Sequence, residues 1–408
     1  MASASPSADF FHPEDPAFYQ DDPNAAFARI RAEDPLHWHE AGSFWCVTKY
    51  ADIQEVSRRP RLFSSARGTQ LFQVLQHGEH SPEVGEGLAR SAPNIIQMDP
   101  PSHNVHRKLV MESFTPRRIA AMEPLVREIA KRSLDAVDAS SPVEFIEEVA
   151  IPMAMLVIAN MLGVPQKDYT EFRRWSDTMV EAGGGTISAE TATVVSELVS
   201  YISGVADERR RDPQDDLISL LLAAEVDGHR LTDGELGMFG LTLLVAGNET
   251  TRNLVSGGAL ALMRNPDQRE ALLADPSLLP NAVEEMLRYV SPVRNFARCA
   301  TQDTELRGKK IREGDYLVLF YGSANRDEEV FGRDSDAFDV RRATARRQIA
   351  FGFGEHLCLG ASLARLEGRV MFEELLARWP RFELAGEPEP LLSSLMNAFV
   401  RMPVVLDP

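Results

Sequence analysis

A single cysteine stands in a loop where its sulfur could do chemistry. Cys358 follows the run Phe351-Gly352-Phe353-Gly354-Glu355-His356-Leu357 and precedes Leu359-Gly360. The two glycines of the run allow backbone turns that other residues resist, and we expect the amides after the cysteine to point toward its sulfur. Such a loop holds a thiolate, the form of cysteine that attacks electrophiles and binds metals. The alternative is a buried, unreactive thiol, the usual state of a lone intracellular cysteine.

A second candidate set places an acid and two hydroxyls inside an otherwise apolar stretch, Ala246-Gly247-Asn248-Glu249-Thr250-Thr251. Glycine weakens a helix, and the Thr250 hydroxyl can bond back to the carbonyl of Ala246, four residues earlier. We therefore expect a helix with a local distortion at this point. The alternative is an ordinary helix with a solvent-facing Glu249 and two tolerated threonines.

Two further pairs have spacings that bring charged side chains together on a helix. His103 and Arg107 are four residues apart. They share one helix face, so both can reach the same anionic group. Glu285 and Arg288 are three apart and are neighbours for the same reason. Taken alone, such pairs are more often surface residues, and their meaning depends on the Cys358 loop.

The spacing Phe-Gly-x-Gly-x-His-x-Cys-x-Gly resembles the haem-ligand signature of the cytochrome P450 family. The stretch Ala-Gly-x-Glu-Thr-Thr resembles that family's oxygen-activation motif, and the two charged pairs match further family motifs in the expected order. The resemblance spans nearly the whole chain. It implies a mainly α fold with small β-sheets (α+β), in which a long central helix crosses over the haem.

The resemblance also implies roles for individual residues. Cys358 would be the axial ligand of the iron in haem b, and a thiolate ligand favours cleavage of the O–O bond. Glu249 would be the proton-delivery acid, and Thr250 the hydroxyl that steadies activated oxygen. The remaining haem contacts would be His103, Arg107, Arg298, His356, Phe351, Ala246 and Gly360, of which the first four would bind the propionates. Glu285 and Arg288 would brace the loop together with Arg342, although Arg341 is a competitor for that place.

Apolar residues near these motifs form the predicted substrate pocket. Small-molecule sites are usually lined by apolar side chains with a few polar groups among them. The candidates are Ile95, Ile96, Val245, Ala246, Val293, Phe296, Met396 and Phe399, with Asn295 and Asn397 as polar handles. The alternative for each of them is ordinary core packing.

The elements that must position these residues are predicted in outline. Thr232 and Glu235 form a capping box that begins the long helix, which we expect to end near Arg264. Strands are expected at 295–300, 304–306 and 316–321, after helices that occupy most of 117–210. Residues 64–97 read as irregular and, by resemblance, close over the substrate. The Gly183-Gly184-Gly185 run predicts a mobile connection, consistent with a lid.

Composition limits the class of protein. The chain has 408 residues, is 44% hydrophobic and contains no linker, so we expect one domain over 1–408 and a monomer. Its polar N-terminus indicates neither a secretory signal nor a membrane anchor, which predicts a cytoplasmic protein. The three cysteines have no disulfide or zinc pattern. The net charge of −18 argues against nucleic-acid binding, since phosphates would be repelled.

The predicted function is that of a haem-thiolate monooxygenase that hydroxylates or epoxidises an apolar steroid, terpenoid or branched lipid with O2. Electrons would come from NAD(P)H through a ferredoxin and its reductase, because the chain has no dinucleotide fingerprint. Basic residues near the loop could guide an acidic donor or could simply be solvated: Arg107, Lys108, Arg117, Arg118, Arg341, Arg342, Arg346 and Arg347. The alternatives are a peroxide-driven haem oxygenase and a non-catalytic haem-thiolate sensor or ligand-binding protein.

Overall fold

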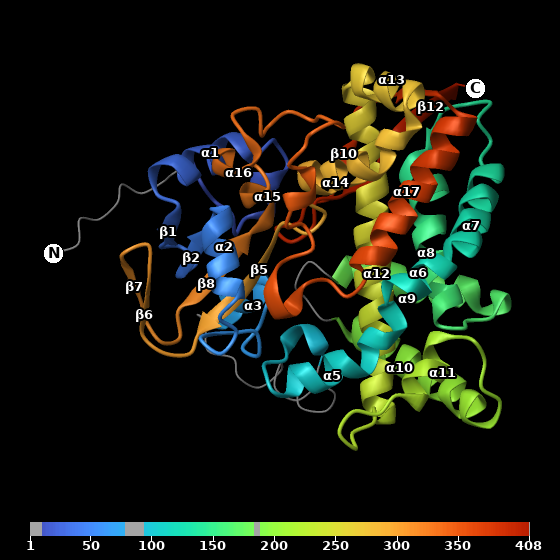
Figure 1. Ribbon diagram of the computed structural model, residues 1–408, viewed down its shortest axis with the longest axis horizontal. Helices are drawn as coiled ribbons and strands as arrows, with labels where there is room; N and C mark the ends of the chain where they lie inside the picture. Colours follow the sequence, from blue (N-terminus) through green and yellow to red (C-terminus); the bar gives the residue numbers. More distant parts are fainter. Residues whose placement is uncertain (1–9, 78–93, 183–187, 408) are drawn as a thin grey trace.

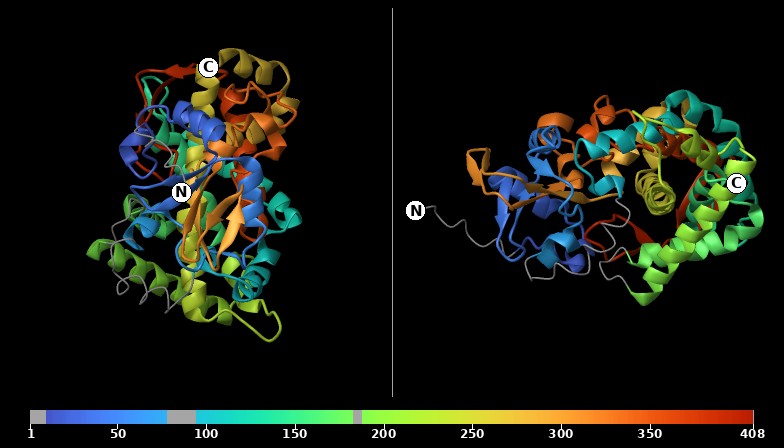
Figure 2. Two further views of the ribbon diagram at one scale, coloured as in Figure 1. Left: turned by 90° about the vertical axis from the view of Figure 1, so that its left-hand side faces the viewer. Right: turned by 90° about the horizontal axis from the view of Figure 1, so that it is seen from below.

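The computed structural model describes residues 10–77, 94–182 and 188–407. The triglycine connection at 183–185 and residues 78–93 of the segment expected to cover the substrate lie outside these residues. The described chain has a strand-rich side and a helix-rich side (Figure 1). The two further views show the same division, with the five-stranded sheet on the side of the N-terminus and the strand β12 near the C-terminus (Figure 2).

Helices make up most of the molecule, as the family resemblance implies. They are α1 (Asn24–Glu33), α2 (Tyr50–Ser57), α3 (Leu71–His77), α5 (Ser102–Met111), α6 (Pro116–Ala121), α7 (Glu123–Asp135), α8 (Ile151–Met161), α9 (Tyr169–Ala182), α10 (Ala189–Arg211), α11 (Leu217–Ala223), α12 (Asp233–Arg264), α13 (Pro266–Ala274), α14 (Leu279–Val290), α15 (Tyr321–Ala324), α16 (Glu328–Phe331) and α17 (Ala361–Arg378).

The strands form small sheets. They are β1 (Leu36–His39), β2 (Phe44–Val47), β3 (Phe63–Ser64), β4 (Val143–Glu144), β5 (Asn295–Ala300), β6 (Thr304–Leu306), β7 (Lys309–Ile311), β8 (Tyr316–Phe320), β9 (Arg381–Leu384), β10 (Glu389–Pro390), β11 (Phe399–Arg401) and β12 (Pro403–Asp407). The largest sheet has the order β1-β2-β8-β5-β3, and only β2 and β8 pair in parallel. An isolated bridge joins Val293 to Met396, so the chain before β5 meets the turn before β11.

Helix α12 is the central element, and its 32 residues run through the helix-rich side (Figure 1). Its start has the predicted capping box: the Glu235 amide donates to Thr232 Oγ1 at 3.3 Å, and Glu235 Oε2 accepts from the Thr232 amide at 2.8 Å. Close packing against α8 depends on Gly247, because a Cβ there would lie 2.5 Å from Ile158 Cδ1. The helix ends at Arg264, before Pro266, as expected.

One local prediction was wrong. Residues 71–77 form helix α3 inside the segment expected to be irregular, because Leu71 and Val74 lie one turn apart and are both buried. The expected local distortion of the long helix stays a prediction: α12 is continuous through Gly247, so neither the threonine bond nor the glycine interrupts it. Helical hydrogen bonding on both sides of one weak position is enough to carry the helix across it.

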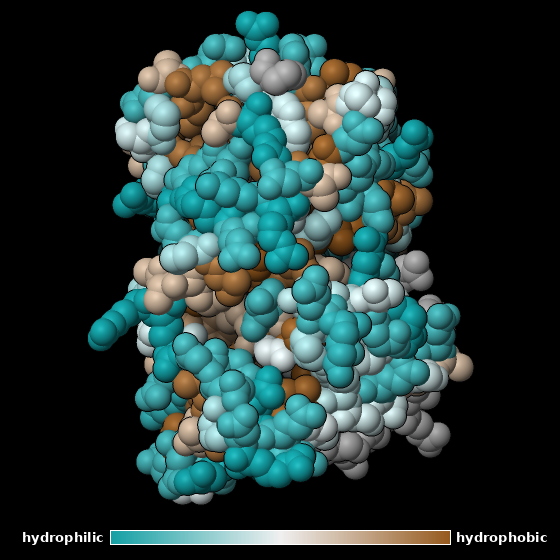
Figure 3. Space-filling model, turned by 90° about the vertical axis from the view of Figure 1, so that its right-hand side faces the viewer, coloured by the Kyte–Doolittle hydropathy of each residue, from teal (hydrophilic) through white to brown (hydrophobic). Residues whose placement is uncertain are grey.

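Buried side chains gather in three apolar clusters. The largest contains residues of α7 to α14 and α17, the second packs on one face of the five-stranded sheet, and the third joins α1 and α3 to that sheet. The face seen in Figure 3 is largely hydrophilic, with smaller apolar areas between the charged residues. No helix in the described part of the chain is both long and apolar enough to cross a bilayer.

Candidate haem-thiolate site

The Cys358 loop is held in place by its own backbone and by α2. The Cys358 amide donates to the carbonyl of Phe351 at 2.9 Å, which closes the loop. Gly352 and Gly354 both have positive φ, of 72° and 77°. A Cβ on Gly354 would also lie 2.4 Å from the carbonyl oxygen of Ser57, at the end of α2. Only glycine meets both demands at 354.

The Cys358 thiol is solvent-accessible although dense protein surrounds it. That protein raises the pKa of the Cys358 thiol by desolvation, while a backbone hydrogen bond from Gly360 and the charges of Arg107 and Arg365 lower it. Arg107 is fixed beside the loop, because its Nη2 donates to the carbonyl of Leu357 at 2.6 Å. Desolvation is the larger effect, so the pKa of the thiol is raised overall in the protein alone, and the thiolate form stays a prediction that depends on a bound metal.

Phe351 and Gly360 flank the cysteine in different ways. The Arg365 guanidinium lies 4.6 Å from the centre of the Phe351 ring, so this ring carries one of the cations that face the sulfur. A Cβ on Gly360 would be 3.9 Å from the Cys358 sulfur. Glycine therefore leaves one side of the sulfur uncrowded.

Two histidines and an arginine, all buried or partly buried, meet beside this loop. The rings of His103 and His356 have centroids 4.2 Å apart. Arg298 is 6% exposed, and it donates only to the carbonyl of Ala297 among the described residues. Burial, Arg298 and His103 together lower the pKa of His356 to about 2. The structure thus brings His103, Arg298 and His356 together, next to Arg107, as the sequence analysis expected.

This cluster has no ion-paired carboxylate in the described chain, although the charge of Asp99 acts on both His103 and Arg298. None of the four side chains forms an ion pair with a carboxylate in the described ranges, and the buried Nε2 of His103 has no hydrogen-bond partner there. A buried polar atom without a partner is costly. The chemistry of this donor set therefore fits an anionic group such as the propionates of haem.

The oxygen-activation motif occupies the middle of α12. Thr250 Oγ1 donates to the carbonyl of Ala246 at 2.6 Å, the bond predicted from the spacing. Ala246 is exposed although it lies halfway along the central helix, so this helix face opens onto accessible space. Glu249 is 6% exposed, and its burial raises the pKa of the carboxyl to about 7 against a weaker opposing effect of Arg252. The Arg252 Nη2 to Glu249 Oε1 distance is 3.7 Å.

Glu367 is a site residue that sequence reasoning missed. Thr251 Oγ1 donates to Glu367 Oε2 at 3.1 Å, which joins α12 to α17, the helix that begins just after Cys358. Burial raises the pKa of Glu367 to about 8. The available signal was an acid within the apolar face of α17, but only the packing of the two helices reveals its partner.

The predicted brace is complete and fully buried. Arg288 Nε and Nη2 each lie 2.7 Å from the carboxylate oxygens of Glu285, and Arg342 Nε donates to Glu285 Oε1 at 3.1 Å. Arg341 is exposed, so it is Arg342, not Arg341, that pairs with Glu285 in the brace. Because Arg342 is 5% exposed, it does not belong to the basic surface with which the sequence analysis grouped it.

The predicted substrate residues fall into separate groups. Val293 and Met396 are joined by their backbone bridge, and Phe296 packs edge-on against Tyr321 with centroids 6.3 Å apart. The Asn295 amide donates to the carbonyl of Ser394 at 2.7 Å, which leaves its Oδ1 without a partner in the described chain. Phe399 and Asn397 line a different cavity, on the far side of the Met396 turn.

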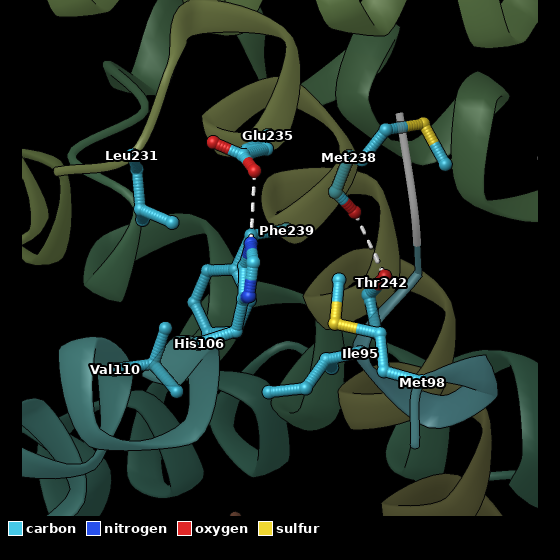
Figure 4. A pocket seen from close by; sticks show the side chains of 9 residues that line it. All are labelled: Ile95, Met98, His106, Val110, Leu231, Glu235, Met238, Phe239 and Thr242. Carbon is cyan, nitrogen blue, oxygen red and sulfur yellow. Dashed lines mark hydrogen bonds and ion pairs between the residues drawn. The ribbon is translucent and has the colours of Figure 1, made fainter. Parts of the chain in front are cut away.

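Ile95 lies at a small pocket between α5 and the first half of α12 (Figure 4). Across from it are Met98, Met238 and Thr242, and the His106 Nε2 to Glu235 Oε1 contact of 2.8 Å closes one end. Sequence reasoning missed these residues. The usable signal was the spacing of Met238, Thr242, Ala246 and Thr250, four apart on one face of α12.

No group of three or more His, Cys, Asp or Glu side chains among the described residues could hold a metal ion by itself. A lone accessible cysteine, a buried Arg298 without an ion pair in the described chain and an accessible position on the central helix fit a haem-thiolate protein. A profile of the family described as Cytochrome P450 matches residues 271–404.

Similar proteins agree with this class. The chain is 37% identical over 391 residues to a steroid C26-monooxygenase of Mycobacterium tuberculosis, with 94% of each chain covered. It is 38% identical to a vitamin D(3) 25-hydroxylase of Pseudonocardia autotrophica, covering 96% of this chain and 95% of the other. The crystal structure of CYP109E1 from Bacillus megaterium in complex with testosterone matches with a TM-score of 0.83 and 34% identity, over 94% and 99% of the two chains. The chain belongs to the cytochrome P450 family, and it is a monooxygenase.

Haem bound at this site supplies the activation of dioxygen. Cys358 would hold its iron, and His103, Arg107, Arg298 and His356 would hold its propionates. The single most direct support is the accessible Cys358 thiol beside Arg107, which forms no ion pair with a described carboxylate.

Proposed function

We propose that this cytochrome P450 contains haem b and hydroxylates or epoxidises an apolar small molecule, with steroids favoured over terpenoids and branched lipids. One atom of O2 enters a C–H or C=C bond, and the other leaves as water with two electrons and two protons. The protein would act as a cytoplasmic monomer, with residues 1–408 as one domain.

The substrate class rests on the lining and on the relatives. The predicted pocket side chains other than the two asparagines are apolar, and Met238 and Met98 extend that surface along α12. Two similar proteins are named for a steroid and for vitamin D(3), and the similar crystal structure holds testosterone. A rigid apolar skeleton suits a pocket with few polar groups.

Glu249 and Thr250 supply the protons in this proposal. A carboxyl group with a pKa of about 7 both holds and releases a proton near neutral pH, as a proton-transfer group must. Glu249 Oε1 is buried and accepts no hydrogen bond from the described residues, and the Arg252 Nη2 atom lies 3.7 Å from it. Thr250, the next residue, presents its hydroxyl on the accessible face of α12.

Electrons would come from NAD(P)H through a ferredoxin reductase and an acidic ferredoxin. Exposed basic residues around the Cys358 loop include Arg58, which lies 4.8 Å from the Phe353 ring centre, and Arg346 and Arg347, which precede the loop in the chain. Docking through exposed charges weakens with salt, because the Debye length falls to about 3 Å at 1 M. Reduction of the enzyme by ferredoxin should therefore slow steeply between 0.05 and 1 M salt, roughly in line with electrostatic steering.

The experiment is a screen of steroids, terpenes and fatty acids for displacement of iron-bound water, followed by product analysis with ferredoxin, reductase and NAD(P)H. A steroid should bind most tightly and give a hydroxylated or epoxidised product. Tight binding of terpenes or fatty acids alone would refute the steroid class. Hydrogen peroxide that replaces the electron chain at full rate would refute the ferredoxin route.

Replacement of Thr250 by Ala tests the proton-handling pair. Loss of one hydrogen bond worth about 1.4 kcal/mol should lower the fraction of electrons recovered in product by about tenfold, while O2 consumption continues. The matched control is Thr193→Ala in α10, where Thr193 makes the same bond to the carbonyl four residues earlier, at 2.9 Å, on an exposed helix face. Full coupling in Thr250→Ala would show that the pair has another role.

A further inference from the structure

A second cavity, of about 510 Å³, lies behind the Met396 turn and away from the Cys358 loop. Its walls come from the segment before α1, the last two turns of α12, the ends of α14 and β8, and the chain around β10 and β11. Helix α12 contributes Gly257, Leu260, Ala261 and Arg264, a single helix face that begins two turns beyond Thr250. The volume is within the range of sites for small organic molecules.

Two arginines in this cavity are only partly satisfied by the protein. Arg294 Nε donates to the carbonyl of Met396 at 3.1 Å and its Nη2 to Asn397 Oδ1 at 3.0 Å, and it forms no ion pair with a described carboxylate. Arg326 is 6% exposed. Its Nε donates no hydrogen bond within the described chain, and Asp336 Oδ1 lies 3.5 Å from it. Burial and the charge of Arg326 lower the pKa of Arg294 to about 10, so both guanidinium groups would gain from an anion.

Aromatic rings hold the two guanidinium groups flat and line the space beside them. Arg294 lies 4.4 Å from the centre of the Tyr19 ring, and Arg326 lies 4.9 Å from that of Tyr289. A guanidinium fixed by stacking presents its free N–H edge in the plane, which matches the two oxygens of a carboxylate. Phe27, Phe320 and Phe399 supply apolar area in the same cavity.

We propose that this cavity binds an organic monocarboxylate, with its carboxylate on Arg294 and Arg326 and its carbon skeleton on the aromatic lining. Exposed acids also belong to the lining, namely Asp21, Asp22 and Glu387. They repel a dianion more strongly than a monoanion, which favours a carboxylate over a phosphate. Arg294 also holds the turn that carries Met396 and Asn397, so the occupant contacts a residue that shapes the predicted substrate wall.

The test uses the haem-loaded enzyme saturated with 4-phenylimidazole, which occupies the iron and blocks the site above the haem. Titration calorimetry with octanoate should show one binding event, and 1-octanol and inorganic phosphate should each bind at least tenfold more weakly. Equal binding of 1-octanol would mean an apolar cavity only, and equal binding of phosphate would mean a simple anion site. Either result, or octanoate binding that disappears once 4-phenylimidazole is present, overturns the proposal.

Two variants locate the site. Arg294→Gln removes the charge, and Gly322→Leu fills the cavity, because a Cβ on Gly322 would meet only the Ser291 Cβ, at 3.8 Å. Each should weaken octanoate binding at least tenfold. Arg378→Gln is the matched control, since Arg378 stacks 5.4 Å from the Trp379 ring centre but lies outside the cavity lining. Gly322→Leu keeps every side-chain bond of Arg294, so unchanged binding in this variant overturns the proposal even if Arg294→Gln fails to fold.

Discussion

Two clusters of buried polar and charged side chains near the Cys358 loop differ in whether the protein itself supplies a counter-charge. In the brace, the carboxylate of Glu285 receives donors from Arg288 and Arg342, and both arginines also donate to backbone carbonyls. In the haem-facing cluster, His103, Arg298 and His356 lie together with no ion-paired carboxylate among the described residues. The first cluster is neutralised within the protein, and the second is not.

The difference separates a structural use of buried charge from a binding use. A buried ion pair that satisfies all of its donors fixes the chain, and breaking it leaves an uncompensated charge. A buried arginine without an ion pair, such as Arg298, raises the free energy of the folded protein until a ligand supplies an anion. Burial is similar in both clusters, so the presence of an internal counter-charge decides which use applies.

The largest expected effect comes from breaking the brace. Glu285→Gln leaves Arg288 and Arg342 buried beside a neutral side chain, and the free energy of unfolding should fall by about 3–5 kcal/mol. Urea unfolding of the haem-loaded enzyme measures the loss. Arg341→Ala is the control, because the exposed neighbour of Arg342 should change stability by less than about 0.5 kcal/mol. A loss below 1 kcal/mol in Glu285→Gln would remove the contrast with the haem-facing cluster.

Glu249 is an intermediate case, a buried acid with one loose ion pair, and its effect depends on pH. Its pKa is raised to about 7 in the folded protein. The folded state therefore holds the proton more tightly than the unfolded state, and stability is lost as pH rises from about 4.5 to about 7. Glu249→Gln removes this loss, so the variant should gain up to about 3 kcal/mol over the parent protein by pH 8.

Urea unfolding at several values between pH 5 and pH 8 measures this gain. Thr250→Val is the control, since it changes the neighbouring side chain without removing a titratable group, and its stability should run parallel to that of the parent protein. If the free energy of unfolding of Glu249→Gln also ran parallel to that of the parent protein across this pH range, Glu249 would not be held in a desolvated state.

The smallest effect in the set concerns the haem-facing cluster. Arg298→Met removes one charge-assisted hydrogen bond of about 2 kcal/mol to a propionate. Transfer of haem to excess apomyoglobin should therefore be faster by about thirtyfold. Arg401→Gln, an exposed arginine in β11, is the control. Haem loss at the parental rate together with a large fall in the unfolding free energy would place Arg298 with the brace.

Local patterns were enough for the sequence to determine the chemistry. The Cys358 motif, the Glu249-Thr250 pair, the Thr232-Glu235 capping box and the bond from Thr250 to Ala246 all depend on residues within ten positions of one another. Such short-range geometry is fixed by helix and turn rules. The family followed from these motifs, and with it the fold class and the long central helix.

Only the tertiary structure decided which distant residues meet. The choice of Arg342 over Arg341 depends on a contact 57 residues away from Glu285. The pairing of Thr251 with Glu367 spans 116 residues, and the cavity at Arg294 gathers segments from Tyr19 to Phe399. The direction of each side chain in the folded protein sets these contacts. Without that direction, the sequence cannot distinguish which of two neighbouring residues of the same type makes the contact. The sequence therefore specified a haem-thiolate oxygenase, while packing specified which buried charges are neutralised and which await a ligand.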